Sequence, residues 1–158
     1  MVDPSDGLQS FQQALLLGQI ELQPGILDQD LHLHVDEPDG EKRLTYVRLD
    51  GTTVTALANF LQCAPIEGLP CLAVAYAVPE AYRNQGRAKE IVNAAISDLR
   101  QVLAESGQHP AFFVEAIVGA DNIYSQRVAE QVISAESEAI TDQLSGLPAL
   151  RYVRRVEV

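Results

Sequence analysis

The sequence predicts an α/β domain with a mixed sheet, in which an antiparallel meander precedes a strand–helix–strand unit. Three observations predict this class. Residues 30–62 contain stretches that alternate between apolar and polar side chains with the period of a strand. Residues 71–78 and 111–118 are almost wholly apolar, as in strands covered on both faces. A long amphipathic helical pattern separates these two runs, so the unit should be right-handed with parallel strands.

The composition limits the class of protein further. The chain has 158 residues, of which 47% are hydrophobic and 21% charged, and its formal net charge is −11. This size and balance predict a single globular domain over residues 1–158. The acidic balance argues against nucleic-acid binding, and no apolar run approaches the length of a membrane span. The N-terminus "MVDPSDGLQS" is polar and acidic, unlike a leader peptide, so we expect a cytoplasmic protein.

The first predicted element is a helix. In "GLQSFQQALLLG", Leu8, Phe11 and Leu15 share one helical face, and Gly18 is a stop signal. A strand is predicted around residues 30–36, where "LHLHV" alternates with period two.

The next two strands should form a tight hairpin. "RLTYVRL" alternates, and the "DG" dipeptide at Asp50 and Gly51 favours a two-residue turn. "TTVTALANFLQ" is the return strand, and we expect "CAPIEGLP" to break it. These strands complete the meander.

The second half begins with the apolar strand at residues 71–78. After Gly86, apolar residues recur at helical spacing from Ala88 to Leu103, and the helix should end near "ESGQHP". The strand "AFFVEAIV" comes next. A second helix is predicted from about Asn122, and "ALRYVRRVEV" is predicted to be the closing strand.

The stretch "YRNQGRAKE" gathers Arg83, Arg87 and Lys89 around Gly86 in an otherwise acidic chain. The first backbone N–H groups of a helix have no internal partner and bind anions, phosphates above all. A glycine lets the backbone approach a bulky ligand. Neither a Walker loop nor a GxGxxG fingerprint is present. The junction therefore predicts a phosphate-binding site of another kind.

Two motifs carry a family resemblance. "VPEAYRNQGRA" resembles the acyl-CoA signature of the GNAT N-acetyltransferase superfamily, Q/R-x-x-G-x-G/A, with its fixed positions at Arg83, Gly86 and Ala88. "GADNIYSQRVAEQV" is similar to the second half-motif of the family, through Asn122 and Ser125. The resemblance covers roughly residues 70–158. The first predicted element departs from the family order, which begins with a strand.

The resemblance implies a GNAT-like acyl-CoA N-acyltransferase fold and acetyl-CoA as the co-substrate. It also implies transfer of an acetyl group by direct attack of a primary amine, on a small molecule or a protein. Dimers are common among such proteins, so a homodimer is one alternative, and the sequence leaves the oligomeric state open. The implied cofactor-binding residues are Ala77, Val78, Arg83, Asn84, Gln85, Gly86, Arg87, Ala88, Asn122 and Ser125.

The catalytic assignments are less direct. Family members often have a tyrosine seven residues beyond the asparagine as a general acid, but that position is Ala129. Tyr124 is the substitute expected from the sequence, against the alternative of an aromatic residue that packs at a helix start. Glu115 is the candidate base, against the alternative of an ion-paired glutamate. A chain of water molecules could replace both. If neither acts, the alternative function is a non-catalytic acyl-CoA-binding sensor or assembly domain.

Other polar groups are assigned to the surface. His32, His34 and Asp36 lie on one strand face but lack further ligands, so a solvated face is expected rather than a metal site. Cys63 and Cys71 have no metal-type spacing and are predicted to be free thiols, and no metal is expected. The basic residues of the closing strand are expected to form surface ion pairs: Arg151, Arg154 and Arg155.

Overall fold

The computed structural model describes residues 4–158, so residues 1–3 of the predicted domain, with the start of the polar N-terminus, lie outside the described residues. Its helices are α1 (Pro4–Leu16), α2 (Arg87–Ser106) and α3 (Ile123–Val132), with short 3-10 helices at Pro38–Gly40 and Glu80–Tyr82. Its strands are β1 (Gln23–Pro24), β2 (His32–Asp36), β3 (Arg43–Asp50), β4 (Thr53–Ile66), β5 (Leu69–Ala77), β6 (Ala111–Gly119), β7 (Glu138–Thr141) and β8 (Pro148–Glu157).

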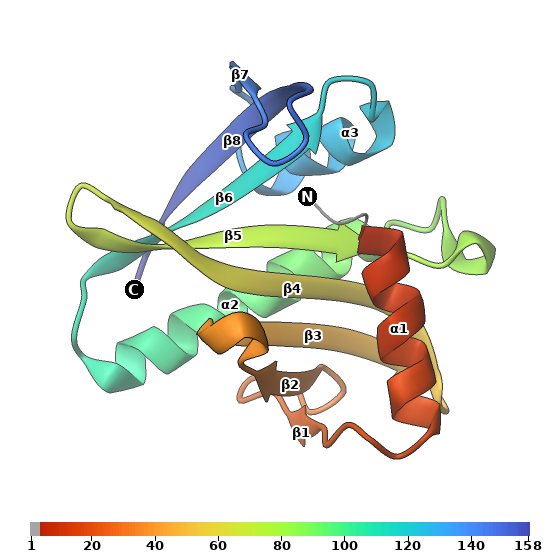
Figure 1. Ribbon diagram of the computed structural model, residues 1–158. Coiled ribbons are helices and arrows are strands. Elements are labelled where there is room, and N and C mark those ends of the chain that lie inside the picture. The colour runs from red at the N-terminus through yellow and green to blue at the C-terminus, as the bar shows by residue number, and fades with distance from the viewer. Residues whose placement is uncertain (1–3) are drawn as a thin grey trace.

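The strands of the described chain form one mixed sheet in the order β1-β2-β3-β4-β5-β6-β8-β7 (Figure 1). The predicted meander is confirmed, because β2, β3, β4 and β5 pair antiparallel in sequence order. The parallel pairing of β5 with β6 across α2 is also confirmed. The sequence pattern missed β1 and β7, which are only 2 and 4 residues long. No helix within residues 4–158 has both the length and the apolar character of a membrane span.

The predicted break within "CAPIEGLP" is confirmed, but it falls at the turn of residues 67–68, late in this stretch. Strand β4 continues through this stretch to Ile66, and the chain reverses at Glu67 and Gly68, which adopt positive φ angles of 53° and 75°. The pairing with β5 shifts between Cys63 and Ile66, as a bulge does. A bulge accommodates a proline, which lacks the N–H that a regular ladder needs, so Pro65 does not end the strand.

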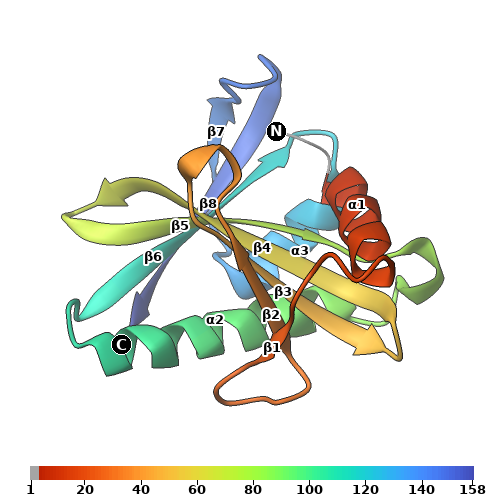
Figure 2. The same ribbon diagram turned by 60° about the horizontal axis from the view of Figure 1, so that its bottom comes forward.

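The two faces of the sheet are covered by different helices (Figures 1 and 2). On one face, α2 and α3 pack on the main core, and α2 contributes fully buried side chains such as Ile91 and Val92. On the other face, the expected side of α1 packs through Leu8, Phe11 and Leu15. On this second face, most of β2 and β3 is not covered by a helix (Figures 1 and 2).

A buried carboxylate fastens an irregular segment to α2. Asp98 is 2% exposed and accepts hydrogen bonds from the Ile26 backbone N–H at 2.7 Å and the Tyr46 hydroxyl at 2.9 Å. Burial and the adjacent carboxylate both raise the pKa of Tyr46, so its hydroxyl remains a donor at neutral pH. The Asp98 side chain therefore ties the segment before β2 to α2 and β3, in addition to the segment's own backbone bonds, such as that from the Gly25 N–H to the Leu31 carbonyl oxygen at 2.7 Å.

Removing this acceptor should cost more than removing one of its donors. We expect Asp98→Ala to lower the free energy of unfolding by about 3 kcal/mol, because two buried donors lose their partner. Tyr46→Phe deletes one hydrogen bond and should cost about 1 kcal/mol. Urea denaturation of both variants measures the difference. Equal losses would show that Asp98 does not anchor the segment.

Candidate functional site

The centre of the sheet contains a slot between β5 and β6. The two strands pair only from Cys71 with Phe113 to Ala73 with Glu115, and then separate toward their C-terminal ends (Figure 1). A cavity of about 70 Å³ lies in the gap, lined by residues 74–76 and 117–119. Beyond Ala73, β5 therefore has an edge that no other strand of residues 4–158 pairs with, and backbone groups on such an edge need another partner.

A second cavity, of about 250 Å³, continues from the slot toward the start of α2. It brings together residues from β5, α2 and α3 that the two sequence motifs had singled out separately. Those that line it are Ala77, Val78, Arg83, Ala88, Asn122, Tyr124 and Ser125. The structure thus brings most of the predicted cofactor-binding residues to one cavity. Tyr124, a predicted catalytic residue, lines the same cavity.

The start of α2 has the geometry of an anion site. Gly86 caps the helix with a positive φ of 72°, and a Cβ atom added there would meet nothing within 4 Å. Within the described chain, the amides of residues 86–89 have no hydrogen-bond acceptor, as expected for a first helical turn. Asn84 has a positive φ of 61°, and residues 83–86 are exposed. In the part of the chain that the structure describes, this corner is therefore open at Gly86.

The two arginines of this loop shape it. The Arg83 Nε donates to the Val78 carbonyl oxygen at 3.0 Å, which ties the loop to the end of β5. The Arg87 Nε donates to the Gln85 side-chain oxygen at 3.1 Å, and its guanidinium lies 5.0 Å from the centre of the Tyr82 ring. Each guanidinium has five N–H donors, so other donors remain for a bound anion.

The opposite side of the cavity is set by a helix cap. The Asn122 side-chain oxygen accepts a hydrogen bond from the Ser125 backbone N–H at 3.1 Å, and this cap begins α3. The capping bond uses the oxygen of the amide and leaves its NH₂ group as a donor. Asn122 therefore holds the first turn of α3, which carries Tyr124 and Ser125, at the cavity.

Tyr76 is a site residue that the sequence reasoning missed. Its ring lies between β5 and α3, where the hydroxyl donates to the Ser125 carbonyl oxygen at 2.7 Å and lies next to the Ala129 backbone. Burial is the main reason that the pKa of Tyr76 is raised, so the phenol stays protonated. The ring occupies space beside α3, and Ala129 is fully buried there. The signal in the sequence was the single hydroxyl within the apolar run "CLAVAYAV".

The two predicted catalytic residues differ in position. Tyr124 lines the larger cavity and is 45% exposed. Glu115 lines neither cavity of the slot, and its carboxylate accepts a hydrogen bond from the Arg151 Nε at 2.7 Å. Glu115 nevertheless lies at the last paired position before the strands separate. Its role as a base stays a prediction. To accept a proton from an amine, the carboxylate must first give up its contact with Arg151.

The histidines of β2 are not brought to a common metal-type site. The His34 Nδ1 lies 3.0 Å from the Glu21 carbonyl oxygen, and Asp36 is held by Arg43 at 2.6 Å. The expected surface pairing of the closing strand is confirmed for Arg151, and Arg155 contacts Glu157 at 2.7 Å.

The fold does bring three metal-type donors together that their spacing did not predict. Within residues 4–158, the donor atoms of Cys63, Cys71 and Glu115 lie within 4.8 Å of one another, because the cysteines are cross-strand partners. Both thiols are free, and burial raises the pKa of each. Glu115 is already paired with Arg151. These donors are thus protonated or occupied.

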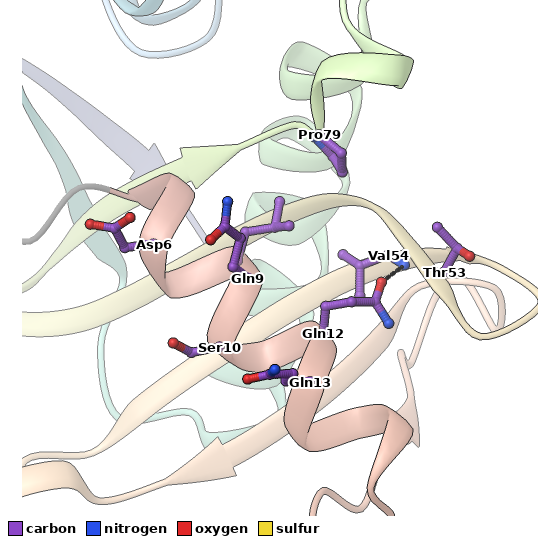
Figure 3. Close-up of a pocket in the computed structure, with 9 residues that line it drawn as sticks. Asp6, Gln9, Ser10, Gln12, Gln13, Thr53, Val54 and Pro79 are labelled. Carbon is purple, nitrogen blue, oxygen red and sulfur yellow. Dashed lines mark hydrogen bonds between the residues drawn. The ribbon is translucent and has the colours of Figure 1, made fainter.

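A separate hollow of about 560 Å³ lies beside α1, between this helix and the start of β4 (Figure 3). Gln12 accepts a hydrogen bond from the Val54 N–H at 2.7 Å and donates to the Thr52 carbonyl oxygen at 2.8 Å. Among residues 4–158, Asp6 is the one charged residue that lines it. The hollow lacks the loop amides and basic side chains of the slot, and its polar contacts fix α1 to the β3–β4 hairpin.

Comparisons with known proteins support the fold assignment. No protein-family model matches the sequence, and no curated protein is similar enough to count as a relative. Solved structures do match. The acetyltransferase of the GNAT family from Streptococcus pneumoniae is 12% identical, with a TM-score of 0.52 over 72% of this chain and 66% of that chain.

Two further matches add detail. The yncA protein of Salmonella typhimurium, solved with its cofactor acetyl-CoA, is 16% identical, with a TM-score of 0.53 over 75% of this chain and 66% of that chain. RimL, a ribosomal L7/L12 alpha-N-protein acetyltransferase, is 16% identical, with a TM-score of 0.55 over 87% and 95%. The chain spans about two thirds of the length of the first two proteins. It has the GNAT acetyltransferase fold, as the signature predicted.

The capping role of Asn122 can be separated from any contact with a ligand. Asn122→Ala should lower the free energy of unfolding by about 1 kcal/mol, because the Ser125 N–H loses its acceptor. Asn122→Asp keeps an acceptor and adds a negative charge at a helix start, so its stability should lie within about 0.5 kcal/mol of wild type. Urea denaturation tests both variants, and equal losses would contradict the capping role.

Proposed function

We propose that this protein is an N-acetyltransferase of the GNAT superfamily, which transfers an acetyl group from acetyl-CoA to a primary amine. One observation carries the proposal: β5 and β6 separate directly beside the open start of α2. An open strand edge binds the amides of an extended ligand, and a helix start binds phosphates. Acetyl-CoA carries both groups. The shared fold with a protein solved with acetyl-CoA supports this assignment.

The proposed binding mode follows the cavity from its outer to its inner end. The pyrophosphate would lie on the amides of the loop and the first turn of α2, with Arg83 and Arg87 adding positive charge. The pantetheine arm would run beside Ala77 and Val78 into the slot. Asn122 and Ser125 would contact the arm from the other side. The remaining proposed contacts come from Asn84, Gln85, Gly86 and Ala88.

The proposed reaction is direct acyl transfer. The unprotonated amine attacks the thioester carbonyl carbon, the new N–C bond forms, and the C–S bond breaks. A backbone N–H on the open edge of β5 would stabilise the developing oxyanion. Tyr124 would give a proton to the leaving thiolate. Glu115 would take the proton that the amine loses, directly or through water, once it has exchanged its contact with Arg151.

A non-catalytic acyl-CoA-binding domain is the second candidate. Two observations favour it: Ala129 replaces the usual acid, and Glu115 is already paired with Arg151. Release of CoA, detected as a free thiol with acetyl-CoA and a panel of primary amines, separates the two functions. Amine-dependent release supports the enzyme. Tight acetyl-CoA binding without release for any amine supports the binding domain. The proposal also includes a cytoplasmic location, expected from the sequence, and a homodimer, for which the family resemblance is the ground.

Gly86 offers a direct test of the cofactor site. Gly86→Glu places a carboxylate where phosphates should bind, and we expect the dissociation constant for acetyl-CoA to rise by at least about 100-fold. Gly107 ends the same helix with a φ of 63° and is equally open. Gly107→Glu therefore imposes similar backbone strain at the other end of α2 and is the matched control.

Calorimetric titration with acetyl-CoA measures both variants, and circular dichroism confirms that each is folded. Only Gly86→Glu should lose affinity. Unchanged affinity in folded Gly86→Glu, or an equal loss in both variants, would contradict the placement of the pyrophosphate.

The two phenols of the site should behave differently. Tyr124→Phe should lower kcat by about 100-fold with little change in acetyl-CoA affinity, because only proton donation is lost. The Tyr76 hydroxyl is already used by Ser125, so Tyr76→Phe should reduce kcat by less than about 5-fold. Steady-state kinetics decide between them. A larger effect of Tyr76→Phe would show that Tyr76 is the proton donor.

A further inference from the structure

A groove lies on the face of the sheet that carries α1. It has a volume of about 530 Å³ and is floored by β2, β3 and β4, with α1 as one wall. This size is typical of sites for small molecules. The lining residues that bear on its chemistry are Asp6, Ser10, Phe11, His34, Thr45 and Asn59.

The groove floor leads to the slot. His34 pairs with Thr45, Thr45 with Asn59, and Asn59 with Ala75, so these residues form one cross-strand row. Side chains at directly paired positions share a face of the sheet. Ala75 lines the slot cavity. With strands about 4.8 Å apart, Thr45 lies about 10 Å and His34 about 14 Å from Ala75.

Two polar side chains of this row lack partners. Thr45 is 4% exposed and lines the groove, and among the described residues nothing accepts from or donates to its hydroxyl. The half-buried Asn59 amide likewise makes no side-chain hydrogen bond within residues 4–158. Both residues line the groove, so their hydrogen-bonding groups are available to a bound molecule.

The charged groups define what this ligand carries. Asp36 and Arg43 satisfy each other through two contacts, at 3.0 and 2.6 Å, so Arg43, the one Lys or Arg among the described residues that line the groove, is already paired. The His34 Nδ1 lies 3.0 Å from the Glu21 carbonyl oxygen, which can only accept, so in the neutral tautomer that donates this bond Nε2 is an acceptor. Asp6 adds a carboxylate on the α1 wall. The part of the groove formed by residues 4–158 therefore combines a carboxylate and an imidazole with neutral amide and hydroxyl groups, and its Arg43 guanidinium is already paired.

We propose that this groove binds the body of the acceptor amine, and that the acceptor is a small primary amine rich in hydrogen-bond donors and without a carboxylate. Diamines and hydroxylated amines belong to this class. The reactive amine lies at Ala75. The other hydrogen-bond donors of this substrate reach Asn59, Thr45 and the end of the groove that His34 and Asp6 line. This inference rests on the proposed acetyl transfer and deepens it, because it names the second substrate by its chemistry.

A matched pair of probes tests the class. 1,4-Diaminobutane and 4-aminobutanoate have the same length but differ in an ammonium or a carboxylate at the far end. We expect kcat/KM for the diamine to exceed that for the amino acid by at least about tenfold, with D-glucosamine also accepted. Equal rates for the matched pair would overturn the proposal. A trialanine peptide that is acetylated about tenfold faster than every small amine would overturn it too.

Thr45→Val tests the groove itself. It should raise KM for 1,4-diaminobutane about tenfold while the Kd for acetyl-CoA stays unchanged. Thr55→Val is the matched control, because Thr55 is 2% exposed, bonds only the Arg48 carbonyl oxygen and does not line the groove. An unchanged KM in Thr45→Val, or an equal rise in both variants, would overturn the proposal and leave acetyl transfer intact.

Binding measured without turnover distinguishes failure of the two proposals. In the CoA-loaded protein, 1,4-diaminobutane should shift the NMR signals of the Thr45 and Asn59 amides. If these shifts appear while no amine releases CoA from acetyl-CoA, the groove assignment stands and the acetyltransferase function fails. If neither shifts nor release appear, the groove assignment is overturned.

Discussion

The site depends on one constraint in the sheet: β5 and β6 pair over a short parallel stretch and then follow different neighbours. β5 stays paired with β4 as far as Ala77, and β6 stays paired with β8 as far as Gly119. Neither strand can close the gap without breaking its other ladder. The backbone groups along the gap therefore need hydrogen-bond partners from water or a ligand. A polar, extended molecule can replace such water.

Polar contacts fix the elements that surround this gap. Tyr76 bridges from β5 to α3, Arg83 ties the signature loop to the end of β5, and Asn122 caps α3. Each contact holds a different side of the cavity. Elements fixed in this way have less freedom to lose when a ligand binds. The groove beside α1 lies on the face of the sheet opposite to α2 and α3, and its floor leads to the same gap.

The sequence predicted the parts of the site that depend on local structure. The start of α2 at Gly86 and the cap at Asn122 are encoded within a few residues, so spacing and residue type were sufficient. The Glu115–Arg151 pair and the contact between Cys63 and Cys71 depend on strand register, which local patterns do not define. Tyr76 was missed for a similar reason, because its partner on α3 lies 49 positions away.

NMR titration of ¹⁵N-labelled protein with acetyl-CoA tests the central claim most directly, since it reports on each backbone amide. We expect the largest shifts at the amides of residues 84–89 and along the open edge of β5 beyond Ala73, with little change in the hollow between α1 and β4. Saturable binding whose largest shifts lie in that hollow, or no shift at the start of α2, would contradict the claim that this gap and helix start bind the coenzyme.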